Sequence, residues 1–179
     1  GEGIAYTYAH WQQGDWNFTV GNYYEQLGSG LIFRSYEERG LGLDNAMDGV
    51  RLIGDLGNGL QIKAIMGRQR LYFTKGEGVL RGVDLGWDLT QPFPKLSDKN
   101  IYASIGASFV SKFQRGYDPV LNLPNNVGAW AIRGDVSKGL WNWSSEYAYK
   151  INDPSYDNGY IYRPGQALVS TLTFAKKGF

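Results

Sequence analysis

Apolar and polar residues alternate along this chain in runs of roughly ten. In the stretch 141–151, for example, the odd positions are almost all aromatic or aliphatic, and the even positions are mostly polar or charged. A repeat of two places alternate side chains on opposite faces, which is the pattern of a β-strand with one apolar and one polar face. The chain is therefore expected to form long strands.

Strands with this alternation account for most of the chain. No window shows a sustained apolar stripe with a period of 3.6 residues and caps, so no helix is predicted. The predicted strands number roughly nine and cover residues 3–11, 16–20, 46–56, 60–70, 78–89, 101–113, 128–138, 141–151 and 167–175.

The connections between these strands alternate in length. The tight ones are 12–15, 57–59 and 139–140, and the intermediate connection 90–100 is counted with them. The longer ones, rich in Gly, Asn, Asp, Pro and Tyr, are 25–47, 71–77, 114–127 and 152–164. Tight turns on one side and long loops on the other are typical of an up-and-down transmembrane β-barrel.

Tryptophans gather near the predicted tight turns. Five of the six lie there, and they are predicted to anchor the membrane interface: Trp11, Trp16, Trp87, Trp141 and Trp143. Indole rings prefer the boundary between lipid and water. The alternative is a set of core tryptophans in a soluble sandwich. Arg68 and Arg81, on the predicted lipid face, are expected near strand ends, where a charge costs little.

The stretch 21–51 is the densest motif in the chain. It contains Tyr-Glu-Gln-Leu-Gly-Ser-Gly-Leu at 24–31 and Arg-Ser-Tyr-Glu-Glu-Arg-Gly-Leu-Gly-Leu-Asp-Asn at 34–45. This stretch resembles a family of uncharacterised, porin-like outer-membrane β-barrel proteins from Bacteroidetes, whereas the rest of the chain shares only the strand rhythm. The resemblance implies an outer-membrane location and a barrel larger than this chain, and it implies no assigned activity.

The same stretch concentrates charges of both signs. One hypothesis is that it folds inward and lines a constriction that selects solutes; the other is a solvated external loop held by its own ion pairs. The candidate residues are Glu25, Arg34, Glu37, Glu38, Arg39, Asp44, Asp48 and Arg51.

Charged residues at polar-face positions of the strands are the other candidates for lining a lumen. They are Lys63, Asp84, Lys112, Arg133, Asp135, Glu146 and Lys150. Their mixed signs predict a weakly selective aqueous pore. A plugged barrel would use the same residues as internal salt bridges, and the sequence leaves both open.

Composition narrows the function classes. The net charge is +1 and no long basic run occurs, which argues against a nucleic-acid partner. Cysteine is absent, and the only histidine, His10, lies beside a predicted tight turn far from the long loops. We predict no catalytic residues, no metal site and no cofactor, and hence a protein that is not an enzyme.

Residues 1–179 are thus predicted to be a single domain, an incomplete all-β barrel fragment truncated at both ends. The expected function is a porin-like diffusion channel, or the membrane component of an envelope assembly, in the outer membrane of a Gram-negative bacterium. Its expected partners are outer-membrane lipid and small polar solutes or glycans, the latter through the tyrosine-rich stretch 156–162. The alternative is a soluble all-β carbohydrate-binding module.

Overall fold

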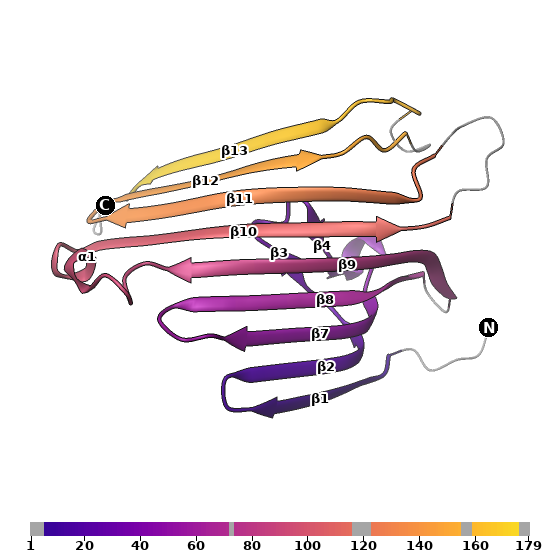
Figure 1. Ribbon diagram of the computed structural model, residues 1–179, viewed down its shortest axis with the longest axis horizontal. Coiled ribbons are helices and arrows are strands. Elements are labelled where there is room, and N and C mark those ends of the chain that lie inside the picture. Colours follow the sequence, from indigo (N-terminus) through magenta and orange to yellow (C-terminus); the bar gives the residue numbers. More distant parts are fainter. Residues whose placement is uncertain (1–5, 72–73, 116–122, 155–158, 176–179) are drawn as a thin grey trace.

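The computed structural model describes residues 6–71, 74–115, 123–154 and 159–175. Nine strands in it form one antiparallel sheet, in which neighbours follow one another along the chain. They are β1 (Tyr8–Gln13), β2 (Trp16–Tyr23), β7 (Met47–Asp55), β8 (Leu60–Leu71), β9 (Thr74–Asp88), β10 (Ile101–Phe113), β11 (Asn126–Lys138), β12 (Trp141–Lys150) and β13 (Gly165–Phe174). The predicted all-β class is confirmed. The sheet is open, with β1 and β13 at its two edges (Figure 1).

The tight turns lie together at one end of the sheet (Figure 1). Between β7 and β8, Gly57, Asn58 and Gly59 all have positive φ, at 83°, 51° and 78°. Glycine adopts this left-handed backbone without steric penalty, so the Gly-Asn-Gly sequence specifies the turn. The Leu60 amide donates to the Gly57 carbonyl at 3.0 Å and closes it.

Two predictions about connections are wrong. The expected loop 71–77 is mostly strand, because β8 continues to Leu71 and β9 begins at Thr74, and these two residues pair. The connection 90–100, predicted without a helix, holds the short helix α1 (Pro94–Asp98). Pro94 opens this helix, where its missing N–H costs nothing. No helix in the described residues is both long and apolar enough to cross a membrane.

The extension of β9 also moves one charge. Arg81 is the central residue of β9. The expectation that it lies near the end of its strand is therefore wrong. Its neighbour on β10 is Ser111, which is close to the end of that shorter strand.

Residues 24–46, here called the inner segment, connect β2 to β7 and lie across one face of the sheet, behind the middle strands in Figure 1. The segment contains two small two-stranded sheets, one of β3 (Gln26–Leu27) with β4 (Phe33–Arg34) and one of β5 (Glu37–Glu38) with β6 (Leu43–Asp44). A single 3₁₀ turn, η1 (Arg39–Leu41), joins β5 to β6. We call the face under the inner segment the covered face, and the opposite one the open face.

The buried core lies between the inner segment and the covered face. Its members come from the segment and from strands spread across the sheet: Tyr23, Leu27, Met47, Ile65, Val110 and Ala129. Leu27 is completely buried. Burial of these side chains fixes the segment against the sheet.

Candidate functional site

The candidate site is the polar part of the covered face together with the inner segment. Charged residues of β7, β8, β9, β11 and β12 point toward the segment, because every second residue of a strand lies on the same face of the sheet. Ionisable groups that leave water are stable only when they are paired or hydrogen-bonded. Their pairing is therefore the informative feature.

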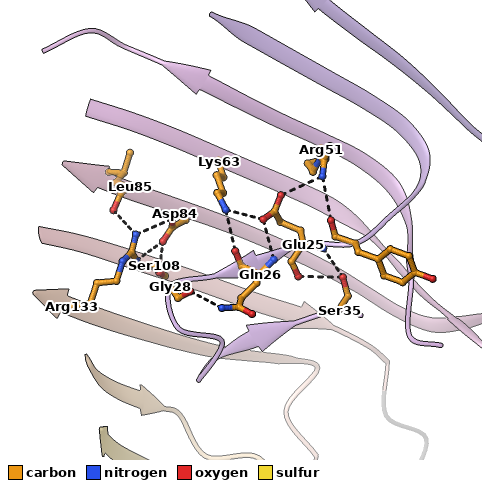
Figure 2. Close-up of polar contacts among 11 residues, drawn as sticks. Glu25, Gln26, Gly28, Ser35, Arg51, Lys63, Asp84, Leu85, Ser108 and Arg133 are labelled. Atoms are coloured by element: carbon orange, nitrogen blue, oxygen red, sulfur yellow. Dashed lines mark hydrogen bonds and ion pairs between the residues drawn. The ribbon is translucent and has the colours of Figure 1, made fainter. Parts of the chain in front are cut away.

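Glu25 forms the first charged cluster (Figure 2). One carboxylate oxygen accepts from Lys63 Nζ at 2.8 Å, and the other accepts from Arg51 Nη1 at 3.5 Å. Only 8 % of the Glu25 side chain is exposed. A carboxylate from the inner segment is thus held between two cations of neighbouring strands, which pins the start of the segment to the sheet.

Backbone contacts around Glu25 complete this cluster. The Ser35 hydroxyl accepts from the Glu25 amide at 2.8 Å, and Lys63 also donates to the Gln26 carbonyl at 3.3 Å. Arg51 donates to the Tyr24 carbonyl and to the Thr19 hydroxyl, both at 3.2 Å. The polar groups of the segment here are satisfied by side chains of the sheet and by Ser35 of the segment itself.

Tyr24 and Asp44 connect the two ends of the inner segment. The Tyr24 hydroxyl donates to Asp44 Oδ1 at 2.9 Å, and the same oxygen accepts from the Ala46 amide. Burial, and then the hydrogen bond to the Asp44 carboxylate, raise the pKa of the Tyr24 hydroxyl well above its ordinary value. Tyr24 therefore stays protonated and remains a donor throughout the physiological range.

Asp84 forms the second charged cluster, further along the covered face (Figure 2). Its two oxygens accept from the two terminal nitrogens of Arg133 at 2.6 and 3.0 Å, a bidentate geometry. Ser108 donates its hydroxyl to Asp84 and accepts from Arg133 at 3.0 Å. The Arg133 side chain lies over Gly106, where an added Cβ would approach its guanidinium carbon to 2.4 Å. A side chain at position 106 would displace the guanidinium from this position.

Glu146 is buried, and no cation among the described residues forms an ion pair with it. In the sheet register Glu146 faces Arg133, but the guanidinium of Arg133 turns to Asp84 instead. Glu146 Oε2 accepts from the Ser29 amide of the inner segment at 2.7 Å, and Oε1 has no hydrogen-bond partner among the described residues. Only 4 % of the residue is exposed.

A cavity of about 280 Å³ opens beside Glu146, between the inner segment and strands β11 to β13. Asp135 also lines it and accepts from the Ser104 hydroxyl at 3.3 Å. Among the described residues, no basic side chain forms an ion pair with Asp135 or Glu146. No group of three or more side chains suited to a metal ion is found in the described part of the chain.

Most of the predicted lining residues belong to the two clusters, to the cavity or to the exposed part of the inner segment. The two clusters bring together Glu25, Arg51 and Lys63, and Asp84 with Arg133, while Asp135 and Glu146 line the cavity. Arg34, Glu37, Glu38 and Arg39 are exposed on the inner segment, where Arg39 pairs with Glu37 at 3.2 Å.

The remaining predicted residues lie away from these clusters. Asp48 pairs with Lys75 at 2.7 Å, and Lys150 pairs with Asp153. Lys112, also on the covered face, lies over Gly78. His10 contacts the Thr19 hydroxyl at 3.2 Å, beside the first tight turn.

The predicted interfacial tryptophans lie at the tight-turn end of the sheet. Trp11 pairs with Phe18 beside the first turn, and Trp141 is the first residue of β12. The Trp87 indole donates to the Asn58 carbonyl of the Gly-Asn-Gly turn at 3.1 Å. Of the tyrosine-rich stretch predicted to contact glycans, residues 156–158 lie outside the described residues.

The sequence reasoning missed the apolar part of the covered face. Ile65 and Val110 occupy polar-face positions, yet both are buried under the inner segment. The signal is present in the sequence, because both residues stand next to apolar open-face residues and break the alternation. A strand that is apolar on both faces is either covered by protein on both faces, or covered by protein on one face and in contact with lipid on the other.

The fold and site together define an all-β protein whose single large sheet carries an ion-paired inner segment on one face. All 179 residues match the family of unknown function DUF6029, and the protein belongs to this family. No curated protein and no solved structure matches the chain.

Proposed function

We propose that this protein forms part of the wall of a transmembrane β-barrel in the outer membrane of a Gram-negative bacterium, as a porin-like channel or as the membrane component of an envelope assembly. The observation that carries the proposal is an apolar row across the open face. In the sheet register it runs over eight strands without a charged residue: Trp16, Gly54, Ile62, Leu85, Ala107, Ile132, Tyr147 and Leu168.

The open face presents large apolar side chains that no described part of the chain covers. Phe109, Ile132 and Leu168 are 51 %, 53 % and 67 % exposed. The accessible surface totals 12283 Å², whereas a compact monomer of this mass would have about 8,700 Å². An apolar surface of this extent needs a cover, and lipid suits a sheet whose apolar residues occupy every second position.

The ends of the strands also fit a bilayer. Tryptophans at the tight-turn end match the aromatic girdle of an outer-membrane barrel. Among the described charges on the open face, Arg81 is the one at the middle of its strand, and its long side chain can extend toward the loop end of the sheet. A barrel also requires strands that pair with β1 and β13, because only closure satisfies the backbone groups of both edges in lipid.

The inner segment supports the channel form of this proposal. In a closed barrel the covered face becomes the lumen, and a segment fixed there by Glu25 and Leu27 narrows it. The exposed charges Arg34 and Arg39 then face the remaining space. Such a constriction selects ions by the sign of its charges.

The location is tested by fractionation of cells that produce the full-length protein. We expect it in the outer membrane, with a gel mobility that changes on heating in detergent. Recovery of natively folded protein from the soluble fraction without detergent would overturn the proposal and favour a soluble carbohydrate-binding protein, which a glycan array would then test.

The channel is tested by conductance of the full-length protein in planar bilayers. The double variant Arg34→Gln/Arg39→Gln should shift the selectivity toward cations. The matched variant Lys95→Gln/Lys99→Gln removes two positive charges at the tight-turn end and should shift it less. An unchanged selectivity of the first variant would contradict the constriction.

A further inference from the structure

The cavity beside Glu146 is closed on several sides by different parts of the fold. The inner segment supplies one wall, and strands β11 to β13 supply the others. Its lining includes Gly28, Ser29, Arg133, Asp135, Ser144 and Glu146. Its volume of about 280 Å³ lies near the lower limit of small-molecule pockets, which are about 300–1,000 Å³. It is too small for an oligosaccharide and ample for a ligand of a few heavy atoms.

Glu146 is a buried acceptor with unused capacity. Its Oε2 is held by the Ser29 amide at 2.7 Å, while the buried Oε1 accepts no hydrogen bond. The cation nearest in register, Arg133, is engaged by both oxygens of Asp84. A buried carboxylate oxygen in this state lacks a donor, and the residue that carries it lines the cavity.

Asp135 makes the cavity doubly acidic. Asp135 pairs with Ser144 in the register and Glu146 pairs with Arg133, so the two carboxylates are diagonal neighbours on one face. The Cα atoms of diagonal neighbours on antiparallel strands are about 7–8 Å apart. Because Arg133 is neutralised by Asp84, the cavity keeps two negative charges on neighbouring strands.

The inner segment is shaped to leave Glu146 in this position. Gly28 has φ +57°, and a Cβ added there would approach Glu146 Oε1 to 2.8 Å. The backbone of the segment therefore approaches the carboxylate as closely as only glycine allows. Glu146 is thus held at the cavity wall by the Ser29 amide, under the backbone of Gly28.

We propose that this cavity binds a small organic diammonium ion, with one ammonium group at Glu146 and the other at Asp135. Two carboxylates without cations favour a cation, and the spacing favours two positive groups joined by a short chain. An organic ion is favoured over a metal ion because no third acidic or histidine ligand is gathered there in the described residues. The Ser144 hydroxyl is an additional acceptor for an ammonium group.

Binding of the diammonium ion does not require that the protein forms a channel, and it is measured without recording conductance. Isothermal titration calorimetry of the full-length protein with 1,4-diaminobutane should show saturable binding near 0.1 M salt. 1-Butylamine, with one ammonium group, should bind at least about tenfold more weakly, and succinate should not bind.

Variants identify the two carboxylates. Glu146→Gln removes the charge but keeps an acceptor for the Ser29 amide. Asp135→Asn likewise removes the charge but keeps an acceptor for the Ser104 hydroxyl. Each should weaken binding of 1,4-diaminobutane by about tenfold or more, as expected for loss of a charged hydrogen bond. The control Asp98→Asn removes an exposed charge in α1 and should leave the affinity unchanged.

Three results would overturn the proposal: no saturable binding by the unaltered protein, equal affinity in Glu146→Gln, or tight binding of Ca²⁺ at this site in place of the diamine. Unfolding curves of both variants identify any loss of binding that comes from misfolding. If Glu146→Gln is misfolded, competition between 1,4-diaminobutane and Ca²⁺ on the unaltered protein decides between the two cations.

Discussion

Asp84 shows how strongly a single residue of the covered face depends on its partner. Its side chain is only 6 % exposed, and Arg133 binds both of its oxygens. Removing one member of a buried ion pair leaves the other charge without compensation, which costs far more than the net contribution of the pair. The side chain at position 84 is therefore expected to dominate local stability.

Asp84→Asn should lower the free energy of unfolding by about 3 kcal/mol. Urea unfolding followed by tryptophan fluorescence measures this. Glu37→Gln breaks the exposed pair with Arg39 and should change stability by less than about 1 kcal/mol. Similar effects of the two substitutions would show that the Asp84 pair is not buried in the folded protein.

At the scale of elements, the inner segment is held at Glu25 by charge, at Leu27 by apolar burial and at Ser29 by the hydrogen bond to Glu146. These three anchors contact β8, β9 and β12, so the segment spans much of the sheet. It is therefore attached as one unit, and loosening its last anchor should loosen the stretch between β3 and β4.

Gly28→Ala should loosen that anchor. Alanine pays about 1–2 kcal/mol for the left-handed backbone, and its Cβ also collides with Glu146. Gly42→Ala is the matched control, since Gly42 has φ +64° but open space around it. Limited proteolysis should cut the inner segment faster in Gly28→Ala than in Gly42→Ala. Equal rates would contradict the contact with Glu146.

The sequence predicts elements better than it predicts the contacts between them. Strand positions follow from alternation, and the range 101–113 predicted for β10 agrees with the structure at both ends. The inner segment is different, because Glu25 reaches Lys63 across 38 residues and Ser29 reaches Glu146 across 117. Such pairs depend on tertiary packing, and local periodicity contains no information about which carboxylate Arg133 selects.

On the scale of the whole molecule, the open face decides what environment the protein needs. The apolar row through Ala107 has no cover from the chain itself among the described residues. A face in lipid and a face in water respond oppositely to charge, because lipid cannot solvate an ammonium group. A substitution that adds a charge and removes little apolar area therefore distinguishes a face in lipid from a face in water.

Ala107→Lys is such a substitution, since Ala107 is already exposed. If the open face lies in lipid, the free energy of unfolding of the full-length protein in liposomes should fall by about 2–4 kcal/mol. Gln166→Lys, at the loop end of β13, should cost about 0–1 kcal/mol. A change below about 0.5 kcal/mol for Ala107→Lys would mean that this face contacts water.

The pairing of Tyr23 with Met47 gives the inner segment a property of its own. Its two ends leave and rejoin the sheet side by side, so the strands on either side would keep their register if the segment were exchanged for a short turn. The sequence of the sheet and the sequence of the inner segment can then change at different rates during evolution, as is common for loops inserted into a sheet. Relatives with the same sheet are expected to differ in what that insert presents on the covered face.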